Sequence, residues 1–386
     1  MHYAQIIMTA PKTKIRVLEC IRQGQIGGGE SHLLSLVENL NKDIYEPVVL
    51  SFTDGPMIDR LQALNVPVHI IPSNKPFDFK VWNKVKQLMA TEKIDLVHAH
   101  GTRANSNVFR AAKALQKPLA YTIHGWSFHV DQPFLIKKIR IAGEKFLVSR
   151  SDLNISVSVS NQKTGKDTIT GFNSVVINNG IDQQKFNADG QYADIRKELN
   201  IPADAVLSLF LARFTGHKQP LTLLRAFEKA LQQNPNLSLL MVGDGDEKQE
   251  ALETVKKAGI GNRVIFQNFR QDVPAVLAAA DIFILPSLWE GLPIGLLEAM
   301  SMGKSIIASN VDGTSDIIEH SKNGYLIELA DVEAALPAAI VNMASDASLR
   351  KELGAKARET VKYNFNAADM TRKIEAEYKK LLKIVH

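Results

Sequence analysis

Two glutamates in the stretch LWEGLPIGLLEAMSMGK, residues 288–304, have the type and spacing to do chemistry. Glu290 lies in a loop after an apolar strand, and Glu298 lies inside the apolar helix predicted to follow. A carboxylate there can accept two hydrogen bonds from a vicinal diol, which suits a ribose. The alternative is a surface Glu290 and a helix-stabilising Glu298, but that does not explain an acid on the apolar face.

The start of the same helix predicts a seat for phosphate. Pro293 suits a first-turn position, where its missing N–H costs nothing. The N–H groups of Ile294 and Gly295 would then point out of the helix, with the positive end of the helix dipole behind them. Glu290 would lie beside this seat, and Glu298 would reach back along the same ligand, because helical side chains lean toward the N-terminus.

Two cations follow another apolar strand. Arg213 and Lys218 lie in the loop of LFLARFTGHKQPLTLL, between that strand and the next predicted helix. A guanidinium fork and an ammonium point charge five residues apart could grip a diphosphate. Taken alone, they could equally be solvated surface charges.

A run of three glycines, residues 27–29, opens a predicted helix after the first strong strand. Gly28 and Gly29 would let backbone N–H groups approach an anion at the helix start. A plain tight turn remains the alternative. The run does not form the G-x-G-x-x-G pattern of dinucleotide-binding dehydrogenases.

Composition bounds the class of protein. The 386 residues suggest two domains, and 45% hydrophobic with 23% charged residues is ordinary for a soluble enzyme. The single cysteine, Cys20, excludes an intrachain disulfide and fits a reducing compartment. No apolar run reaches the roughly 20 residues of a membrane span, and residues 1–14 lack a signal-peptide core. We expect a cytoplasmic enzyme; its net charge of +5 discriminates weakly among anionic small molecules, membranes and nucleic acid.

Strand-like and helix-like patterns alternate along the whole chain, which predicts parallel sheets with helices on both faces. A polar, turn-rich segment, 177–202, separates two such halves. We therefore predict an N-terminal domain at 1–182 and a C-terminal domain at 183–369. The basic amphipathic helix 370–386 is predicted to return to the first domain. In open sheets of this class, ligands bind at the carboxyl ends of strands, where the motifs above lie.

Three other patterns leave alternatives open. Asp244 and Asp246 form a D-x-D, a spacing that could hold a divalent ion, but they lie in a glycine turn, and we predict no metal. His98 and His100 could be two ligands on a strand, with no third in view. The stretch 132–151 mixes apolar and basic residues; it is either a surface helix with one buried stripe or a peripheral contact with an anionic membrane.

In their order, these motifs resemble glycosyltransferase family 4, whose members have the GT-B fold of two Rossmann-like domains facing a cleft. Glu290 and Glu298 match the E-x7-E signature of that family. The resemblance also includes the glycine run, His124 with the glycine after it, NNGID at 178–182, the Arg213–Lys218 pair and VGDGDEK at 242–248. It spans nearly the whole chain.

The resemblance implies a role for each matching residue. Arg213 and Lys218 would neutralise the diphosphate, Glu298 would hold the ribose, and Glu290 would contact the donor sugar. Further assignments are the backbone after Glu290 (Gly291, Leu292, Pro293, Ile294, Gly295) for the donor, Gly28 and Gly29 for the phosphate or acceptor, Phe269 and Arg270 for the base, and His124 for the donor sugar. On the acceptor side, His100, Trp126 and Phe128 could line a groove or simply pack.

The expected activity is retaining transfer of a hexose-type sugar from a nucleotide-sugar, with UDP favoured, to a hydroxyl of a glycan or lipid-linked glycan in cell-surface polysaccharide synthesis. The nucleotide-sugar is a substrate, so no cofactor is expected, and no nucleic acid partner. The alternatives are a nucleotide-sugar epimerase of the same architecture, a dehydrogenase, and a sugar-nucleotide binding protein without activity.

Overall fold

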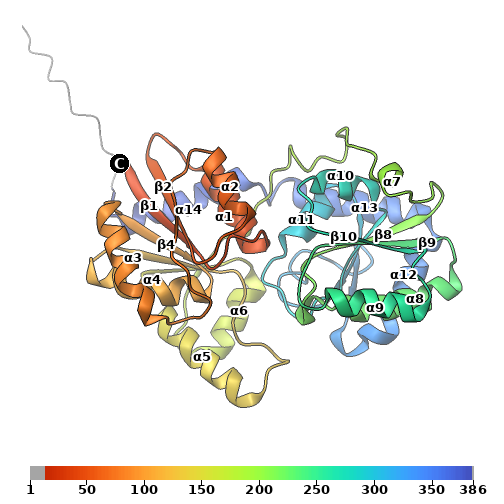
Figure 1. The fold of residues 1–386 in the computed structure, drawn as a ribbon, viewed down its shortest axis with the longest axis horizontal. Coiled ribbons are helices and arrows are strands. Elements are labelled where there is room, and N and C mark those ends of the chain that lie inside the picture. The colour runs from red at the N-terminus through yellow and green to blue at the C-terminus, as the bar shows by residue number, and fades with distance from the viewer. Residues whose placement is uncertain (1–13, 385–386) are drawn as a thin grey trace, which may run out of the picture.

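The computed structural model describes residues 14–384, and these form two α/β halves side by side (Figure 1). The first half is drawn in warm colours and the second in green to blue. The N-terminal segment that lacks a signal-peptide pattern, and the last two residues of the predicted helix 370–386, lie outside the described part. No helix within residues 14–384 is both long and apolar enough to cross a bilayer.

The first half is built on a seven-stranded parallel sheet in the order β3-β2-β1-β4-β5-β6-β7. Its apolar strands are buried on both faces because helices cover each side. The strands are β1 (Ile15–Ile21), β2 (Tyr45–Ser51), β3 (Val68–Ile70), β4 (Leu96–His100), β5 (Leu119–Ile123), β6 (Leu153–Ser156) and β7 (Val175–Val176). The helices are α1 (Gly28–Asn39), α2 (Pro56–Ala63), α3 (Phe79–Thr91), α4 (Thr102–Ala114), α5 (Phe134–Val148) and α6 (Val159–Thr168).

The second half contains a six-stranded parallel sheet in the order β10-β9-β8-β11-β12-β13. Its strands are β8 (Val206–Leu211), β9 (Leu237–Val242), β10 (Val264–Gln267), β11 (Ile282–Leu285), β12 (Ser305–Ser309) and β13 (Tyr325–Ile327). Its helices are α7 (Ile195–Glu198), η1 (Gly216–Lys218), α8 (Pro220–Gln233), α9 (Lys248–Ala258), α10 (Val273–Ala279), α11 (Ile294–Ser301), η2 (Leu329–Asp331), α12 (Val332–Ser345) and α13 (Ala347–Lys362).

The chain crosses between the halves twice, at adjacent points. The Ile181 N–H donates to the Phe365 carbonyl at 2.9 Å, and the Ala367 N–H donates back to the Ile181 carbonyl at 3.0 Å. The last helix, α14 (Ala367–Leu381), then packs on the first half, where Met370, Ile374 and Tyr378 join its core. The blue helix beside α1 in Figure 1 is this segment. The boundary at 182/183 stays a prediction.

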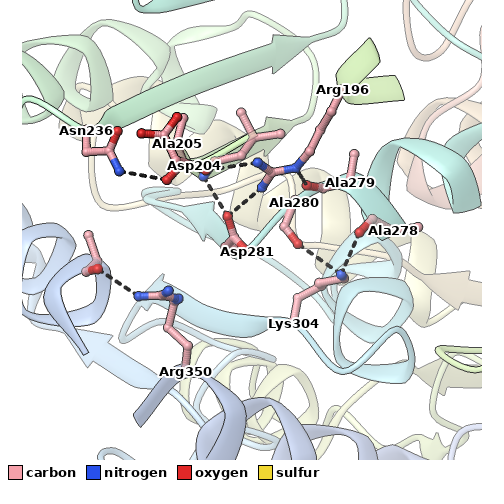
Figure 2. Close-up of polar contacts among 12 residues, drawn as sticks. Arg196, Asp204, Ala205, Asn236, Ala278, Ala279, Ala280, Asp281, Lys304 and Arg350 are labelled. Carbon is pink, nitrogen blue, oxygen red and sulfur yellow. Dashed lines mark hydrogen bonds and ion pairs between the residues drawn. The ribbon is translucent and has the colours of Figure 1, made fainter. Parts of the chain in front are cut away.

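A polar network fastens the amino ends of the second sheet, opposite the edge where ligands bind (Figure 2). Arg196 donates to Asp281 at 2.7 Å and to the carbonyls of Ala279 and Ala205, both at 2.9 Å. Lys304 caps the end of α10 by donating to the carbonyl of Ala280 at 2.9 Å. Because these cations are satisfied by the protein itself, the network anchors the sheet and leaves ligand binding to the other edge.

Candidate active site

A cleft of about 1280 Å³ lies between the halves and is lined by both. Its walls come from the loops after β1, β4 and β5 in the first half and after β8, β9, β10 and β11 in the second. These are the carboxyl ends of parallel strands, as expected for ligand binding in this fold class. Every donor-side residue named from the sequence lines this cleft.

Helix α11 points its N-terminus into the cleft, but it begins one residue later than the sequence predicts. Pro293 is the N-cap residue (φ −72°, ψ 117°), not a first-turn residue, and Ile294 starts the helix. The Pro293 carbonyl accepts from the N–H groups of Leu296 and Leu297. The N–H groups of Ile294 and Gly295 have no acceptor within residues 14–384, so they can receive an anion.

The two cations after β8 differ in how they are partnered. Lys218, at the end of η1, forms an ion pair with Glu290, and both side chains are largely buried. Arg213 lines the same cleft, and its side chain forms no hydrogen bond or ion pair within the described residues. Burial lowers the pKa of Arg213, and Arg22 nearby lowers it further, while Glu30 and Asp246 oppose the shift. A desolvated cation without a partner favours an incoming anion.

Glu298 projects from the second turn of α11 into the cleft without a hydrogen-bond partner in the described structure. Burial raises its pKa to about 8, and the positive charge of Lys185, which also lines the cleft, partly opposes this shift. A carboxyl group with this pKa is mostly protonated at pH 7, which is unusual for a glutamate. Hydroxyl groups donating to the carboxylate would restore its charge.

The loop after β10 contributes an exposed aromatic ring and an arginine. Phe269 is 43% exposed within the cleft. Arg270 is held by Asp272 at 2.6 Å and by Glu198 at 2.6 Å, so its guanidinium is already neutralised. The loop therefore offers a ring face and backbone groups rather than a free cation.

Two glycine segments allow close approach in the cleft. Gly28 begins α1, and a Cβ on Gly29 would lie 3.5 Å from the His124 ring. In the second half, a Cβ on Gly291 would lie 2.0 Å from the His124 carbonyl oxygen, so only glycine fits. The Gly291 carbonyl in turn accepts from Ser158 at 2.9 Å, which joins the two halves beside the site.

His124, at the end of β5, belongs to a buried histidine network. Its Nε2 lies 3.2 Å from Nδ1 of His100, and Nε2 of His100 lies 2.8 Å from Glu19. Burial lowers the pKa of His124 well below its usual range, and His32 and His100 lower it further, so the ring is neutral. Burial alone would raise the pKa of Glu19, but His98 and His100 hold it well below normal, and the carboxylate stays charged.

Sequence reasoning missed Glu19, His32 and Tyr378 as parts of this network. Tyr378 arrives on α14 and donates to Glu19 at 2.9 Å. An acid within the buried run of β1 was a readable signal for Glu19. No local signal marks Tyr378, because it also occupies a core position of an amphipathic helix.

The aromatic residues assigned to the acceptor side are both nearly buried, although Trp126 also lines the cleft. Trp126 and Phe128 are each 4% exposed and stack on one another with ring centres 5.1 Å apart. The Trp126 indole donates to the Asn161 carbonyl at 2.9 Å, and Phe128 does not line the cleft. The side chains turn inward because a hydrophobic core between the sheet and α6 takes them up.

A stack of three rings missed from the sequence joins the halves at the mouth of the cleft. Trp289 lies between His129 of the first half, with ring centres 3.6 Å apart, and His217 of the second, at 4.1 Å. Burial lowers the pKa of His217 to about 2, with Lys218 and Arg213 adding to the effect. The stack places Trp289 beside Glu290, the acid paired with Lys218.

The D-x-D pair belongs to the turn after β9. Asp244 accepts from the Gly245 N–H at 2.9 Å, and Asp246 faces Arg213. Gly243 (φ +143°) and Gly245 (φ +152°) adopt backbone angles that favour glycine. The absence of a metal requirement stays a prediction.

Known families match both halves of the chain. The model of Glycosyltransferase Family 4 matches residues 26–185, and the model of Glycosyl transferases group 1 matches residues 191–360. Together with the cleft, these matches define a glycosyltransferase of two Rossmann-like domains. The chain belongs to the GT-B glycosyltransferases of family 4 and is an enzyme of that class.

Relatives of known name cover nearly the whole chain. An Escherichia coli enzyme, UDP-Gal:alpha-D-GlcNAc-diphosphoundecaprenol alpha-1,3-galactosyltransferase, is 24% identical over 96% of this chain and 98% of its own. N-acetyl-alpha-D-glucosaminyl L-malate synthase of Bacillus anthracis is 27% identical over 80% of each chain. The structure of Anabaena HepE with UDP and glucose superposes with a TM-score of 0.83 at 24% identity, covering 95% of this chain and all of that one. This likeness confirms the predicted GT-B fold.

Proposed function

We propose that this enzyme transfers a hexose from a UDP-sugar to a hydroxyl group of a glycan or lipid-linked glycan in cell-surface polysaccharide synthesis. The observation that carries the proposal is the set of groups around the N-terminus of α11: the Lys218–Glu290 pair, with the side chains of Arg213 and Glu298, which have no partner within residues 14–384. The names of the Escherichia coli relative, which uses UDP-Gal, and of the Anabaena complex with UDP and glucose support this donor class.

In this proposal the diphosphate lies against the start of α11. Arg213 donates to it through its guanidinium, and the N–H groups of Ile294 and Gly295 point at the same charge. Lys218 is shared between the phosphate and Glu290. These groups are fixed before the reaction, so they stabilise the negative charge that develops on the leaving diphosphate without reorganisation.

Glu290 and His124 are the residues assigned to the donor sugar. The carboxylate of Glu290 is kept in the cleft by Lys218 and can accept sugar hydroxyl groups. A hydrogen bond from His124 Nε2 to His100 Nδ1 leaves His124 Nδ1 as a buried acceptor with no partner in the described part of the chain. A sugar hydroxyl is the donor we assign to it.

Transfer is proposed to retain the anomeric configuration. The bond from the anomeric carbon to the diphosphate oxygen breaks, and the acceptor oxygen forms its bond on the same face. The acceptor proton passes to the leaving phosphate oxygen. No protein acid is needed in this step, which is consistent with a neutral His124 ring. No metal ion is assigned either, since Arg213, Lys218 and the helix terminus face the diphosphate.

A panel of UDP-, GDP- and ADP-sugars tests the proposal. With a lipid-linked glycan acceptor, the enzyme should release UDP from one UDP-sugar, and the product should carry the new sugar with the donor's anomeric configuration. Release of an epimerised UDP-sugar would favour the epimerase. Binding without release of nucleotide, with every acceptor, would favour a binding protein.

The acceptor side includes a surface that fits an anionic membrane. The first turns of α5 expose Phe134 (72%), Leu135 (67%) and Ile139 (60%). The buried residues of α5 are instead Glu144, Leu147 and Val148, near its C-terminal end. The surface-helix interpretation therefore accounts for only part of α5.

Basic residues on the same turns supply the charge that anionic lipid attracts. Lys137, Lys138 and Arg140 alternate with the exposed apolar residues, and each basic side chain near such a surface is worth about 1 kcal/mol. Ile139 and Arg140 also line the cleft. We assign this patch to the membrane that carries a lipid-linked acceptor.

Vesicle sedimentation distinguishes this contact from simple exposure. The protein should sediment with phosphatidylglycerol vesicles and much less with phosphatidylcholine vesicles. Phe134→Ser with Leu135→Ser should abolish sedimentation, whereas Phe79→Ser, which removes a ring of similar exposure (67%) on α3, should not. Equal sedimentation of all variants would refute the assignment to α5.

A further inference from the structure

Three histidines meet beneath the cleft, and one ring nitrogen from each can face a common point. His32 of α1, His100 of β4 and His124 after β5 offer nitrogens that lie within 4.8 Å of one another. His32 is 1% exposed and His100 is 2% exposed. The rings of His100 and His124 line the cleft, so the point can be reached from solvent through it.

Hydrogen-bond partners show that His32 and His100 each keep one nitrogen with a lone pair. Nδ1 of His32 lies 2.9 Å from Oδ1 of Asn179, whose amide nitrogen donates to the Leu292 carbonyl, so this Nδ1 holds the proton. Nε2 of His32 is then a bare lone pair, and it is buried without a partner in the described residues. Nε2 of His100 donates to Glu19, so its Nδ1 is a lone pair as well.

Neutral rings are the form that binds metal ions. The hydrogen-bond partners of His32 and His100 are those of neutral rings, each with one N–H and one lone pair. Moving the single proton of His124 from Nε2 to Nδ1 gives a third lone pair at the shared point. Nδ1 of His124 can take that proton, because no group of the described chain bonds to it.

The spacing matches tetrahedral coordination. With metal–nitrogen bonds of about 2.0–2.1 Å, ligand nitrogens lie roughly 3.4 Å apart and imidazole ring centres roughly 5 Å apart. Here Nδ1 of His100 lies 3.2 Å from Nε2 of His124. The ring centres of His32, His100 and His124 are separated by 5.4, 4.7 and 5.4 Å.

Outer contacts orient two of the ligands as they do in known zinc sites. Glu19 accepts from His100 and Asn179 accepts from His32, each on the nitrogen away from the shared point. The structure also brings together Glu19, His98 and His100, but this second group does not offer three unbonded ligand atoms. Both nitrogens of His98 and both oxygens of Glu19 are already hydrogen-bonded, to Tyr378, Thr122 and His100.

We propose that His32, His100 and His124 form an inhibitory site for a zinc-class divalent ion, with the fourth position open to the cleft. Imidazole nitrogens select zinc, copper and nickel over magnesium. Binding would fix His124 with its proton on Nδ1, so this atom could no longer accept a donor hydroxyl. That consequence rests on the proposed role of His124; the binding itself does not.

Titration calorimetry with Zn²⁺ alone tests the site, using the full chain without a histidine tag after chelator treatment. The expected result is one ion per chain, with His32→Gln losing most of the affinity and His69→Gln, which removes a partly buried histidine of β3 paired with Glu92, unchanged. Asn179→Ala, which removes an orienting group rather than a ligand, should weaken binding about 10–100-fold. Co²⁺ should give the intense absorption of a tetrahedral ion, and lose it in His32→Gln.

Activity measurements complete the test. Zn²⁺ should inhibit wild-type transfer, chelator should restore it, and the rate of His32→Gln relative to its own ion-free rate should resist Zn²⁺. Absence of binding, or equal affinity in wild type and His32→Gln, would overturn the site. If His32→Gln fails to fold, unaltered affinity in Asn179→Ala together with an octahedral Co²⁺ spectrum of the wild type would do the same. Binding without inhibition would refute the inhibitory effect of the site and, with it, the assigned role of His124.

Discussion

Replacement of Glu298 by glutamine tests how the second acid of the cleft engages the nucleotide. The carboxyl group has no partner in the described structure, and burial raises its pKa to about 8. A ribose diol donates two hydrogen bonds, which favour the charged form and lower the pKa. Nucleotide binding should therefore release a proton from Glu298.

The magnitude follows from that pKa. At pH 7 a group of pKa 8 is about 90% protonated, so binding should release about 0.9 proton if the bound carboxylate is fully charged. The free-energy cost of removing this proton falls as pH rises, because Glu298 of the free enzyme is then already deprotonated. Affinity should increase about tenfold between pH 7 and pH 9, which equals about 1.4 kcal/mol.

Calorimetry with UDP in buffers of different ionisation enthalpy measures the proton release directly. The terminal phosphate of UDP can itself lose a proton near pH 6, so the quantity to compare is the difference between wild type and Glu298→Gln. The variant should release about 0.9 proton fewer at pH 7 and show little change in affinity above it. Equal release from both proteins, or wild-type affinity that falls toward pH 9, would refute contact between the ribose and a charged Glu298.

Three further predictions concern the other charged groups. Arg213→Ala should cost roughly 1.5–3 kcal/mol in kcat/KM and reduce kcat more than UDP affinity; wild-type kinetics would remove Arg213 from the site. Glu290→Gln should bind UDP normally in calorimetry yet lose most turnover, and a loss of UDP affinity instead would place Glu290 at the nucleotide. Transfer should survive EDTA, whereas a loss that Mn²⁺ or Mg²⁺ restores would implicate Asp244 and Asp246.

The sequence predicted the frame of the molecule because apolar strands and amphipathic helices alternate in both halves. Two short strands of the first sheet escaped notice. β6 (Leu153–Ser156) contains polar Asn154 and Ser156, and β7 is only two residues long, so neither gives a buried-strand pattern. The last helix was predicted at 370–386, but it starts earlier, at Ala367, where Asn366 caps it by accepting from the Ala368 N–H.

Site residues were predictable where position after a strand implies direction, and not elsewhere. Arg213, Glu290 and Glu298 follow the strands of one parallel sheet, whose carboxyl ends share an edge. Trp126 and Phe128 also follow a strand and are nearly buried, but of the two Trp126 lines the cleft and Phe128 does not, because proximity in sequence to His124 does not fix which way a loop turns. Local sequence gives no sign of contacts made at long range.

Glu19 shows what such a contact can add. Its carboxylate accepts hydrogen bonds from His100 of β4 and from Tyr378 of α14. Helix α14 follows the whole second half in the sequence, so the second of these contacts is made at long range. The carboxylate fixes the tautomer of His100, and His100 in turn sets where His124 carries its proton. The helix that closes the fold therefore reaches, through three hydrogen bonds, the ring assigned to the donor sugar.

The ion pair between Lys218 and Glu290 also bears on how the cleft can bind a donor diphosphate. In the free enzyme Glu290 neutralises Lys218, whereas the Arg213 side chain has no ion-pair partner among the described residues and can receive an anion. When a diphosphate arrives, Lys218 can bind it while keeping its contact with Glu290, because an ammonium group has three donors. The same glutamate can then turn its second oxygen to the sugar. The Lys218–Glu290 ion pair would thus link the position of the diphosphate leaving group to the position of the donor sugar.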